Sequence, residues 1–371
     1  MSPQKTAANQ AAKTILQVIQ LLLFLYLFLV SINLMGASMK MFGKGFAETL
    51  INNTANPLVG LFIGIFATSL VQSSSTTTSI VVGLVGGGVM TVSNAIPIIM
   101  GANMGTSVTN TLVSLANMNR SEEFKRSFSA SIVHDFFNLL SVLVLFPLQQ
   151  LTNFLGAFAE WTEHYVEVWG LVGGGAHAPN FLKTITTPAV DFLKHLTGEL
   201  PWLLLILSFV ILFLALQQIV SALRALVIKR AEAMFDKILF KNGFRAFLVG
   251  LVLTLAAQSS SITTSLIVPM AGAGLLTLHQ IFPYTLGANV GTTITAILAS
   301  LVTSNPSAVT VAFAHLLFNV CGIVIWWPLS RVPLGLTNWV TEKATVNKIY
   351  PLAYIALVFF IIPLIVILLF R

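Results

Sequence analysis

Residues 72–115 read QSSSTTTSIVVGLVGGGVMTVSNAIPIIMGANMGTSVTNTLVSL, and residues 258–301 read QSSSITTSLIVPMAGAGLLTLHQIFPYTLGANVGTTITAILASL. The two stretches align without a gap at an offset of 186 residues (258 − 72 = 186), and 21 of the 44 aligned residues are identical. A further match at an offset of 181 (315 − 134 = 181) joins His134-Asp-Phe-Phe-Asn138 and His315-Leu-Leu-Phe-Asn319. Matches in the same order along two segments indicate an internal duplication.

Composition places this duplication in a membrane protein. Apolar residues make up 56% of the 371 residues, charged residues only 8%, and the mean hydropathy is +0.90. Soluble domains carry about 25% charged residues, whereas several stretches here reach the roughly 20 apolar residues that span a bilayer. The net charge of +7 comes mainly from lysines and arginines in short loops. We therefore expect a lipid bilayer and no nucleic acid as partner. The single cysteine, Cys321, excludes an intrachain disulfide.

Each QSSS motif lies between two apolar runs that are too short to cross a bilayer. The runs are Leu58–Val71 and Thr76–Met90 in the first copy, and Phe244–Ala257 and Ile262–Leu276 in the second. Because a helix of about 15 residues reaches only half way across, we predict two re-entrant helical hairpins, 57–90 and 244–276, with tips near the midplane. The next segment of each repeat contains proline and then Gly-Ala-Asn-x-Gly-Thr. Its two glycines predict a broken transmembrane helix in each repeat.

Loop charges orient the repeats. The basic segments Arg224–Arg245, 120–126 and 331–348 are expected in the cytoplasm, and the acidic segment between Leu148 and Pro201 outside. With a cytoplasmic N-terminus the hairpins enter from opposite sides, so the repeats are inverted. The predicted all-α polytopic organisation is a cytoplasmic tail (1–14), a first inverted repeat (15–148), an extracellular or periplasmic loop (149–200), a second inverted repeat (201–328), a cytoplasmic loop (329–350) and a C-terminal transmembrane helix (351–371).

The hairpin tips have the chemistry of an ion site. Half-helices that meet inside a membrane present free N–H groups, which favour an anion, and free carbonyls, which favour a cation. Hydroxyls and the amides of Gln72, Gln258, Asn103 and Asn289 add donors and acceptors. The alternative is helix packing, in which Ser, Thr and Gly are also common. The sequence has no metal cluster, nucleotide loop or nucleophile–base pair, so we expect neither an enzyme nor a cofactor.

Asp135 is the strongest single candidate for a functional residue. It falls within the predicted span Phe128–Phe146, where ionisable residues are costly and usually functional. Its counterpart in the second repeat is Leu316, so a carboxylate on one side suits one cation site more than the other. A structural pair with His134, or a place near the loop, is the alternative. The recurring histidines fit either support of the site or helix packing.

These motifs resemble the type II sodium-dependent phosphate cotransporter family. The resemblance rests on the paired QSSS motifs, on AIPIIMGANMGTSVTN at 95–110, on VHDFFN at 133–138 and on GANVGTT at 287–293, and it runs from about Leu34 to Pro328. It implies secondary transport of inorganic phosphate driven by sodium as the coupling ion. The short termini, the lack of cysteines in the outer loop and an end one span early depart from animal members. A bacterial protein of the plasma (inner) membrane is therefore expected. The oligomeric state stays open, with a homodimer as one option.

The resemblance and the internal symmetry imply site residues. The sodium ligands are predicted to be Gln72, Thr106, Thr109, Asp135, Asn138, Gln258, Ser259, Thr292 and Thr295. Phosphate is predicted to lie near Ser73, Ser74, Ser75, Asn103, Ser259, Ser260, Ser261 and Asn289. Asp135 matches the position where electrogenic members carry Asp, which implies electrogenic uptake by alternating access. A sodium-coupled carrier of carboxylates or other oxyanions, an anion channel and a non-transporting scaffold are the alternatives.

Overall fold

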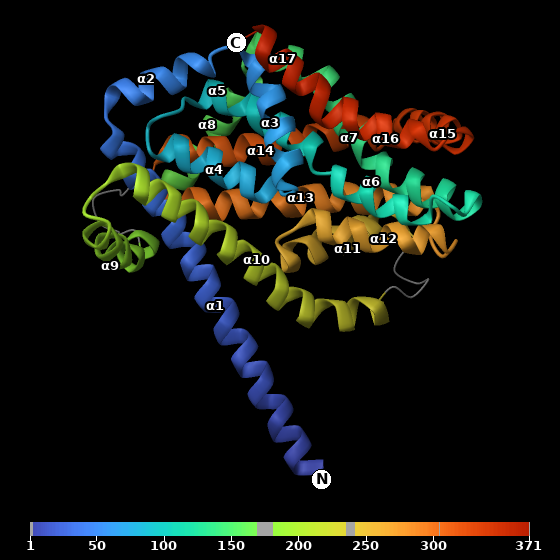
Figure 1. Ribbon diagram of the computed structural model, residues 1–371, viewed down its shortest axis with the longest axis horizontal. Helices are drawn as coiled ribbons and strands as arrows, with labels where there is room; N and C mark the ends of the chain where they lie inside the picture. Colours follow the sequence, from blue (N-terminus) through green and yellow to red (C-terminus); the bar gives the residue numbers. More distant parts are fainter. Residues whose placement is uncertain (1–2, 169–180, 235–241, 304, 371) are drawn as a thin grey trace.

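The computed structural model describes residues 3–168, 181–234, 242–303 and 305–370, and every secondary-structure element in these ranges is a helix (Figure 1). In chain order the elements are α1 (Pro3–Phe42), α2 (Lys44–Asn53), α3 (Pro57–Val71), α4 (Ser74–Gly86), α5 (Val92–Gly105), α6 (Val108–Ser114), the 3-10 turn η1 (Leu115–Asn117), α7 (Ser121–Thr152), α8 (Phe154–Val168), α9 (Phe181–Leu196), α10 (Pro201–Met234), α11 (Gly243–Ala257), α12 (Ser260–Gly272), α13 (Leu278–Thr303), α14 (Pro306–Trp326), α15 (Arg331–Val346), α16 (Ile349–Ala356), the π-helical turn η2 (Leu357–Ile361) and α17 (Ile362–Phe370). The expected all-α class is confirmed. Residues 235–241 of the predicted basic segment and glycines 173–175 of the predicted outer loop lie outside the described ranges.

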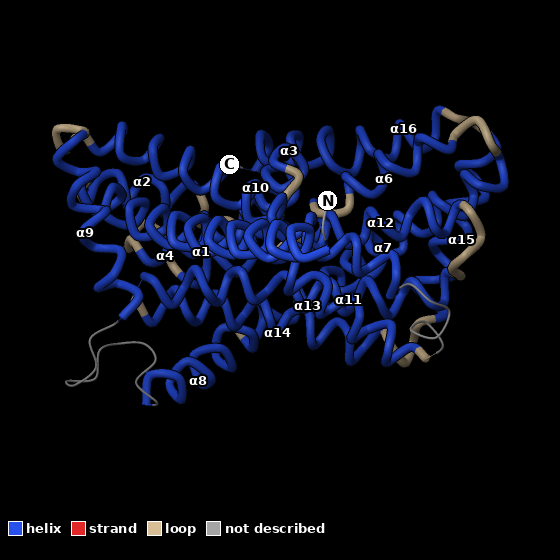
Figure 2. Tube along the Cα trace, turned by 90° about the horizontal axis from the view of Figure 1, so that it is seen from below, coloured by secondary structure: helices blue, strands red, loops and turns tan. Residues whose placement is uncertain are grey.

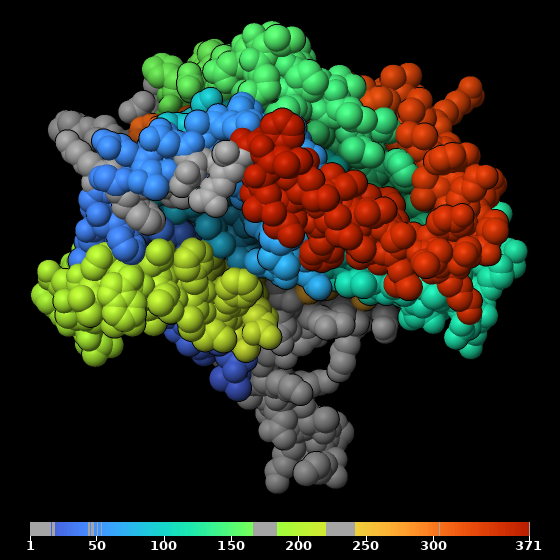
Figure 3. Space-filling view, turned by 45° about the horizontal axis from the view of Figure 1, so that its top comes forward, coloured from blue at the N-terminus to red at the C-terminus, as the bar shows by residue number. Residues whose placement is uncertain are grey.

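The described part of the chain has six helices that are long and apolar enough to cross a membrane. They are Ile19–Phe42, Ser121–Thr152, Pro201–Ile219, Leu278–Thr303, Pro306–Trp326 and Ile349–Phe370. The last of these lies on the outside of the bundle (Figure 3), where Leu368 and Leu369 are 67% and 72% exposed. Apolar side chains on an outer face are expected in lipid. The chain is an integral membrane protein.

The spans run between two ends of the molecule. Figures 1 and 2 both show α9 at one end and α15 at the opposite end, and we refer to these as the α9 end and the α15 end. The helix α4 leads from its QSSS motif toward the α9 end, whereas α12 leads from the second motif toward the α15 end (Figure 1).

The first two residues of each QSSS motif end one short helix and begin the next. Gln72 and Gln258 have φ angles of 56° and 51°, in the left-handed region that commonly ends a helix. Ser73 and Ser259 are extended, and their hydroxyls accept backbone N–H groups of α4 and α12 at 3.2 and 3.4 Å. Such N-caps satisfy donors that a helix start leaves free. Local capping therefore fixes a sharp reversal inside the bundle.

The prediction of a broken helix in both repeats is wrong for the second. The first repeat is interrupted at Thr106–Ser107, between α5 and α6, but α13 runs continuously across the second Gly-Ala-Asn-x-Gly motif. The glycines serve close packing. A Cβ on Gly287 would lie 1.9 Å from the carbonyl oxygen of Phe247 on α11, and one on Gly101 would lie 1.9 Å from that of Leu61 on α3.

Candidate ion-binding site between the two QSSS motifs

The two motifs contact each other reciprocally. The Ser75 hydroxyl donates to the carbonyl oxygen of Gln258 at 3.3 Å, and the Ser261 hydroxyl donates to that of Gln72 at 3.4 Å. Both pairs obey the offset of the duplication (75 + 186 = 261 and 72 + 186 = 258). The tips of the two hairpins therefore meet inside the bundle.

A cavity of about 640 Å³ adjoins the two tips. Its lining includes the predicted residues Gln72, Ser73, Ser75, Thr109, Gln258, Ser259 and Ser261. It also includes three polar residues that sequence reasoning missed, Thr76, Gln217 and Ser265. The available signal for Gln217 was a glutamine pair inside the apolar span of α10. Because none of the described lining residues is charged, the field in the cavity comes from hydroxyls, amides and helix ends.

Helix ends give the site a mixed polarity. The helices α4 and α12 both begin at the tips, and their first N–H groups carry positive partial charge. The helices α3 and α11 both end there, and their last carbonyls carry negative partial charge. An oxyanion and hard cations that prefer oxygen ligands could bind side by side in such a place.

The two predicted sodium sites differ in their hydrogen bonds. In the second repeat the Thr295 hydroxyl donates to Gln258 Oε1 at 2.7 Å. In the first repeat the Thr109 hydroxyl, at the equivalent position (109 + 186 = 295), is buried without a hydrogen-bond partner. Thr106 and Thr292 each donate to a carbonyl of their own helix at 3.1 Å. The hydrogen bond between threonine and glutamine is therefore present in the second repeat, whereas Thr109 of the first repeat makes none.

Four predicted phosphate residues lie outside the cavity lining. Ser74 and Ser260 are buried in the first turns of α4 and α12. Asn103 and Asn289 are buried in a hydrogen-bonded network with Asn138 and the two matching histidines of the duplication, His134 and His315. The side-chain amide of each asparagine contacts residues of the opposite repeat.

Asp135 lies next to the break between α5 and α6. Its Oδ2 accepts the phenol of Tyr354 on α16 at 2.7 Å, whereas the hydroxyl of Ser107 donates to the carbonyl oxygen of Met104 at 3.0 Å. Its Oδ1 is buried without a partner. The alternative of a pair with His134 is wrong, because His134 Nε2 contacts Asn289 and its Nδ1 has no partner. Sequence reasoning missed Tyr354, whose only signal was a hydroxyl in an apolar span.

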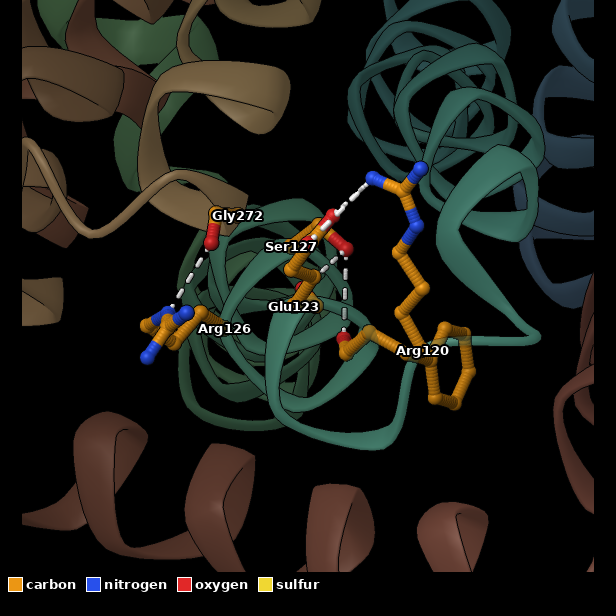
Figure 4. A network of polar contacts seen from close by, with 6 residues as sticks. Arg120, Glu123, Arg126, Ser127 and Gly272 are labelled. Carbon is orange, nitrogen blue, oxygen red and sulfur yellow. Dashed lines mark hydrogen bonds and ion pairs between the residues drawn. The ribbon is translucent and has the colours of Figure 1, made fainter.

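The far end of each hairpin is held by the other repeat. Arg126 Nε donates to the carbonyl oxygen of Gly272, at the end of α12, at 3.0 Å (Figure 4). At the equivalent end of α4 (86 + 186 = 272), the carbonyl oxygen of Gly86 accepts the Asn305 amide at 3.1 Å. A cation at a helix C-terminus is favourable because the carbonyls there carry negative partial charge. One far end is therefore held by a charged group and the other by a neutral one.

Comparison with known proteins identifies the family. The family model described as Na+/Pi-cotransporter matches residues 27–159 and 211–338. The chain is 33% identical to the sodium-dependent phosphate transport protein 2A of Rattus norvegicus, across 95% of this chain and 68% of that protein. It is 32% identical to the sodium-dependent phosphate transport protein 2B of Homo sapiens, across 94% of this chain and 64% of that protein. No solved structure matches. The chain belongs to the Na+/Pi-cotransporter family.

Proposed function

We propose that this protein takes up inorganic phosphate together with sodium, by alternating access, across the plasma (bacterial inner) membrane. The observation that supports this most directly is the reciprocal meeting of two uncharged QSSS tips at one cavity, in a chain whose relatives are named for sodium-dependent phosphate transport. Bound sodium supplies the positive charge that the cavity lining lacks. The transport of phosphate is then coupled to that of sodium, because each bound ion strengthens the binding of the other through electrostatic attraction.

In this proposal phosphate lies at the N-termini of α4 and α12. The hydroxyls of Ser73, Ser75, Ser259 and Ser261 face it from the cavity lining, while Ser74 and Ser260 contribute first-turn N–H groups. Asn103 and Asn289 support the tips indirectly, because the buried network fixes α5 and α13, which pack against the hairpin helices α3 and α11. Sodium takes the Gln258–Thr295 side with Ser259 and Thr292, and the Gln72–Thr109 side with Thr106. Asp135, with Asn138 nearby, belongs to the cation sites of the first repeat.

The cavity extends along α12 but not along the equivalent part of α4. This asymmetry is consistent with inverted repeats in one of two access states. Ser265, on α12 between the tip and the α15 end, lines the cavity. Its equivalent Ser79 (79 + 186 = 265), between the tip and the α9 end, is fully buried. We therefore assign the structure to a state open toward the α15 end, and we propose from the positive-inside rule that this end and the N-terminus face the cytoplasm.

Uptake of radiolabelled phosphate into proteoliposomes tests the function. An inward sodium gradient is expected to drive accumulation, and replacement of sodium by choline is expected to abolish it. The Ser75→Ala/Ser261→Ala double variant removes both reciprocal tip contacts and is expected to lower uptake strongly. Sulfate and succinate serve as competitors. Competition by succinate with phosphate inert would point to a carboxylate carrier, and sodium-independent equilibration would point to a channel.

A further inference from the structure

The buried asparagine network is symmetric in sequence but not in its hydrogen bonds. Asn103 corresponds to Asn289 (103 + 186 = 289), and Asn138 corresponds to Asn319 (138 + 181 = 319). In one half of the network, Asn289 Nδ2 donates to Asn138 Oδ1 and Asn138 Nδ2 donates to the carbonyl oxygen of Asn103, both at 2.9 Å. Asn138 thereby joins α7 to α5 and to α13.

The equivalent bonds are open in the other half. Symmetry pairs Asn103 Nδ2 with Asn319 Oδ1, yet both atoms are buried without a hydrogen-bond partner. The amide nitrogen of Asn319 donates instead to the carbonyl oxygen of His315, one turn earlier on its own helix, at 3.1 Å. Buried unpaired polar atoms are uncommon and costly. Here the unpaired atoms are a donor, Asn103 Nδ2, and an acceptor, Asn319 Oδ1, which the symmetry of the network would join to each other.

The two histidines of the network each contact one asparagine of the glycine motifs. His315 Nε2 contacts Asn103 Oδ1 at 3.2 Å, and His134 Nε2 contacts Asn289 Oδ1. Both contacts are present, so each histidine holds one asparagine of the glycine motifs in the state described here. Only the bonds of Asn138 and Asn319 distinguish the two halves.

We propose that Asn138 and Asn319 are alternative partners in a hydrogen-bond exchange. Asn138 bonded to Asn289 holds the state described here, and Asn319 bonded to Asn103 holds the state open toward the α9 end. Because one set of bonds replaces an equivalent set, the two states stay close in free energy, as a carrier that cycles between them requires. Both residues act as positioning residues. This proposal rests on the alternating access of the proposed function.

The test measures which state is populated, without transport. Ser265→Cys and Ser79→Cys are made separately in a Cys321→Ala background, and each is labelled by a membrane-impermeant thiol reagent applied to either face of vesicles. Choline replaces sodium and phosphate is omitted, so the result does not depend on substrate binding. Ser265→Cys is expected to react from one face, and Ser79→Cys to react more slowly and from the opposite face.

Substitutions in the network should move the two rates in opposite directions. Asn138→Leu removes the bonds of the state described here and is expected to raise the Ser79→Cys rate relative to the Ser265→Cys rate. Asn319→Leu removes an acceptor used only in the other state and is expected to lower that ratio. Each change is expected to be about two- to tenfold, the effect of one net hydrogen bond. The double variant should return toward the parent ratio.

Ser141→Ala is the matched control, since the Ser141 hydroxyl bonds only within its own helix, to the carbonyl oxygen of Phe137 at 2.8 Å. If Asn319→Leu fails to fold, Asn319→Ala removes the same acceptor with less volume. The exchange is overturned if Asn138 and Asn319 variants shift the ratio the same way, or if neither differs from Ser141→Ala. If the Asn138 and Asn319 variants shift the ratio in opposite directions but the protein does not accumulate phosphate, the exchange stands and the proposed function is overturned.

Discussion

Asp135 is the acidic side chain of the buried stretch of α7, and it is only half satisfied. Tyr354 donates to one carboxylate oxygen at 2.7 Å, while the other is buried without a partner. A carboxylate inside a membrane protein is costly unless a cation or several donors compensate it. The open oxygen beside the break at Ser107 therefore favours a bound cation. The second repeat has Leu316 at the equivalent position, so this charge exists once.

Replacing Asp135 by glycine is expected to reduce the charge moved per phosphate. In the proposed function a sodium ion bound at this carboxylate contributes to the transported charge, and its binding is expected to weaken without the carboxylate. The ratio of current to radiolabelled phosphate, measured on the same proteoliposome preparation, gives this quantity. Leu316→Gly is the control, because it exchanges one neutral residue for another at the symmetric position. An unchanged ratio in Asp135→Gly would refute the role assigned to the carboxylate.

The backbone at Gln72 allows its two roles to be separated. Gln72 is in the left-handed region, with φ of 56°, and its side chain lines the cavity. Gln72→Gly is expected to keep or slightly raise stability, because glycine adopts this conformation freely, but to weaken sodium-dependent uptake through the lost amide. Gln72→Val is expected to lose stability as well, by about 1–2 kcal/mol, because a β-branched residue is strained there. Thermal unfolding in detergent, read beside uptake, distinguishes the two. Equal unfolding temperatures for both variants would contradict the backbone argument.

At the scale of elements, each hairpin is joined to the helix that follows it by glycines. Gly64 and Gly101 lie between α3 and α5, and Gly250 and Gly287 lie between α11 and α13. All four obey the offset of 186 residues, a signal that was present in the sequence. Periodic glycines, however, are compatible both with helix breaks and with close helix contacts. Composition and spacing cannot separate these two outcomes, which is why the continuous α13 was missed.

Close packing predicts that an alanine at Gly287 is not tolerated. The added Cβ would meet the backbone carbonyl oxygen of Phe247 at 1.9 Å, and a backbone atom of a packed helix cannot move aside cheaply. We expect a loss of about 1–3 kcal/mol, typical of overpacking, measured as a lower unfolding temperature. Gly335→Ala on α15 is the matched control, since no atom lies within 4 Å of its Cβ. It should be neutral or gain up to about 1 kcal/mol of helix propensity. Similar unfolding temperatures for the two variants would show that α11 and α13 separate easily.

At the scale of the molecule, the sequence predicted the helical class, the position of both tip motifs and most of the polar residues that line the cavity. Repetition and hydropathy provide this information, because both can be read from short stretches of the sequence. The contribution of α10 to the cavity and the contact of Tyr354 with Asp135 were not predictable. Each depends on the packing of segments more than a hundred residues apart (354 − 135 = 219), for which one sequence has no pattern.

The two ends of the bundle are expected to face opposite sides of the membrane. The helices α9 and α15 lie at opposite ends (Figure 2), and His195 of α9 and Lys343 of α15 are both exposed. In a Cys321→Ala background, His195→Cys is expected to react with an impermeant thiol reagent added outside intact cells. Lys343→Cys is expected to react only after the membrane is opened. Reaction of both from outside would overturn the assigned topology.

The single Asp135 has a consequence for how such a protein can be encoded. Two identical one-repeat subunits, paired in opposite orientations, would have to place a carboxylate at both symmetric positions or at neither. A fused chain can vary one position alone, as Asp135 and Leu316 do. Fusion therefore allows the number of buried carboxylates to change by one, while the duplicated framework around them stays the same.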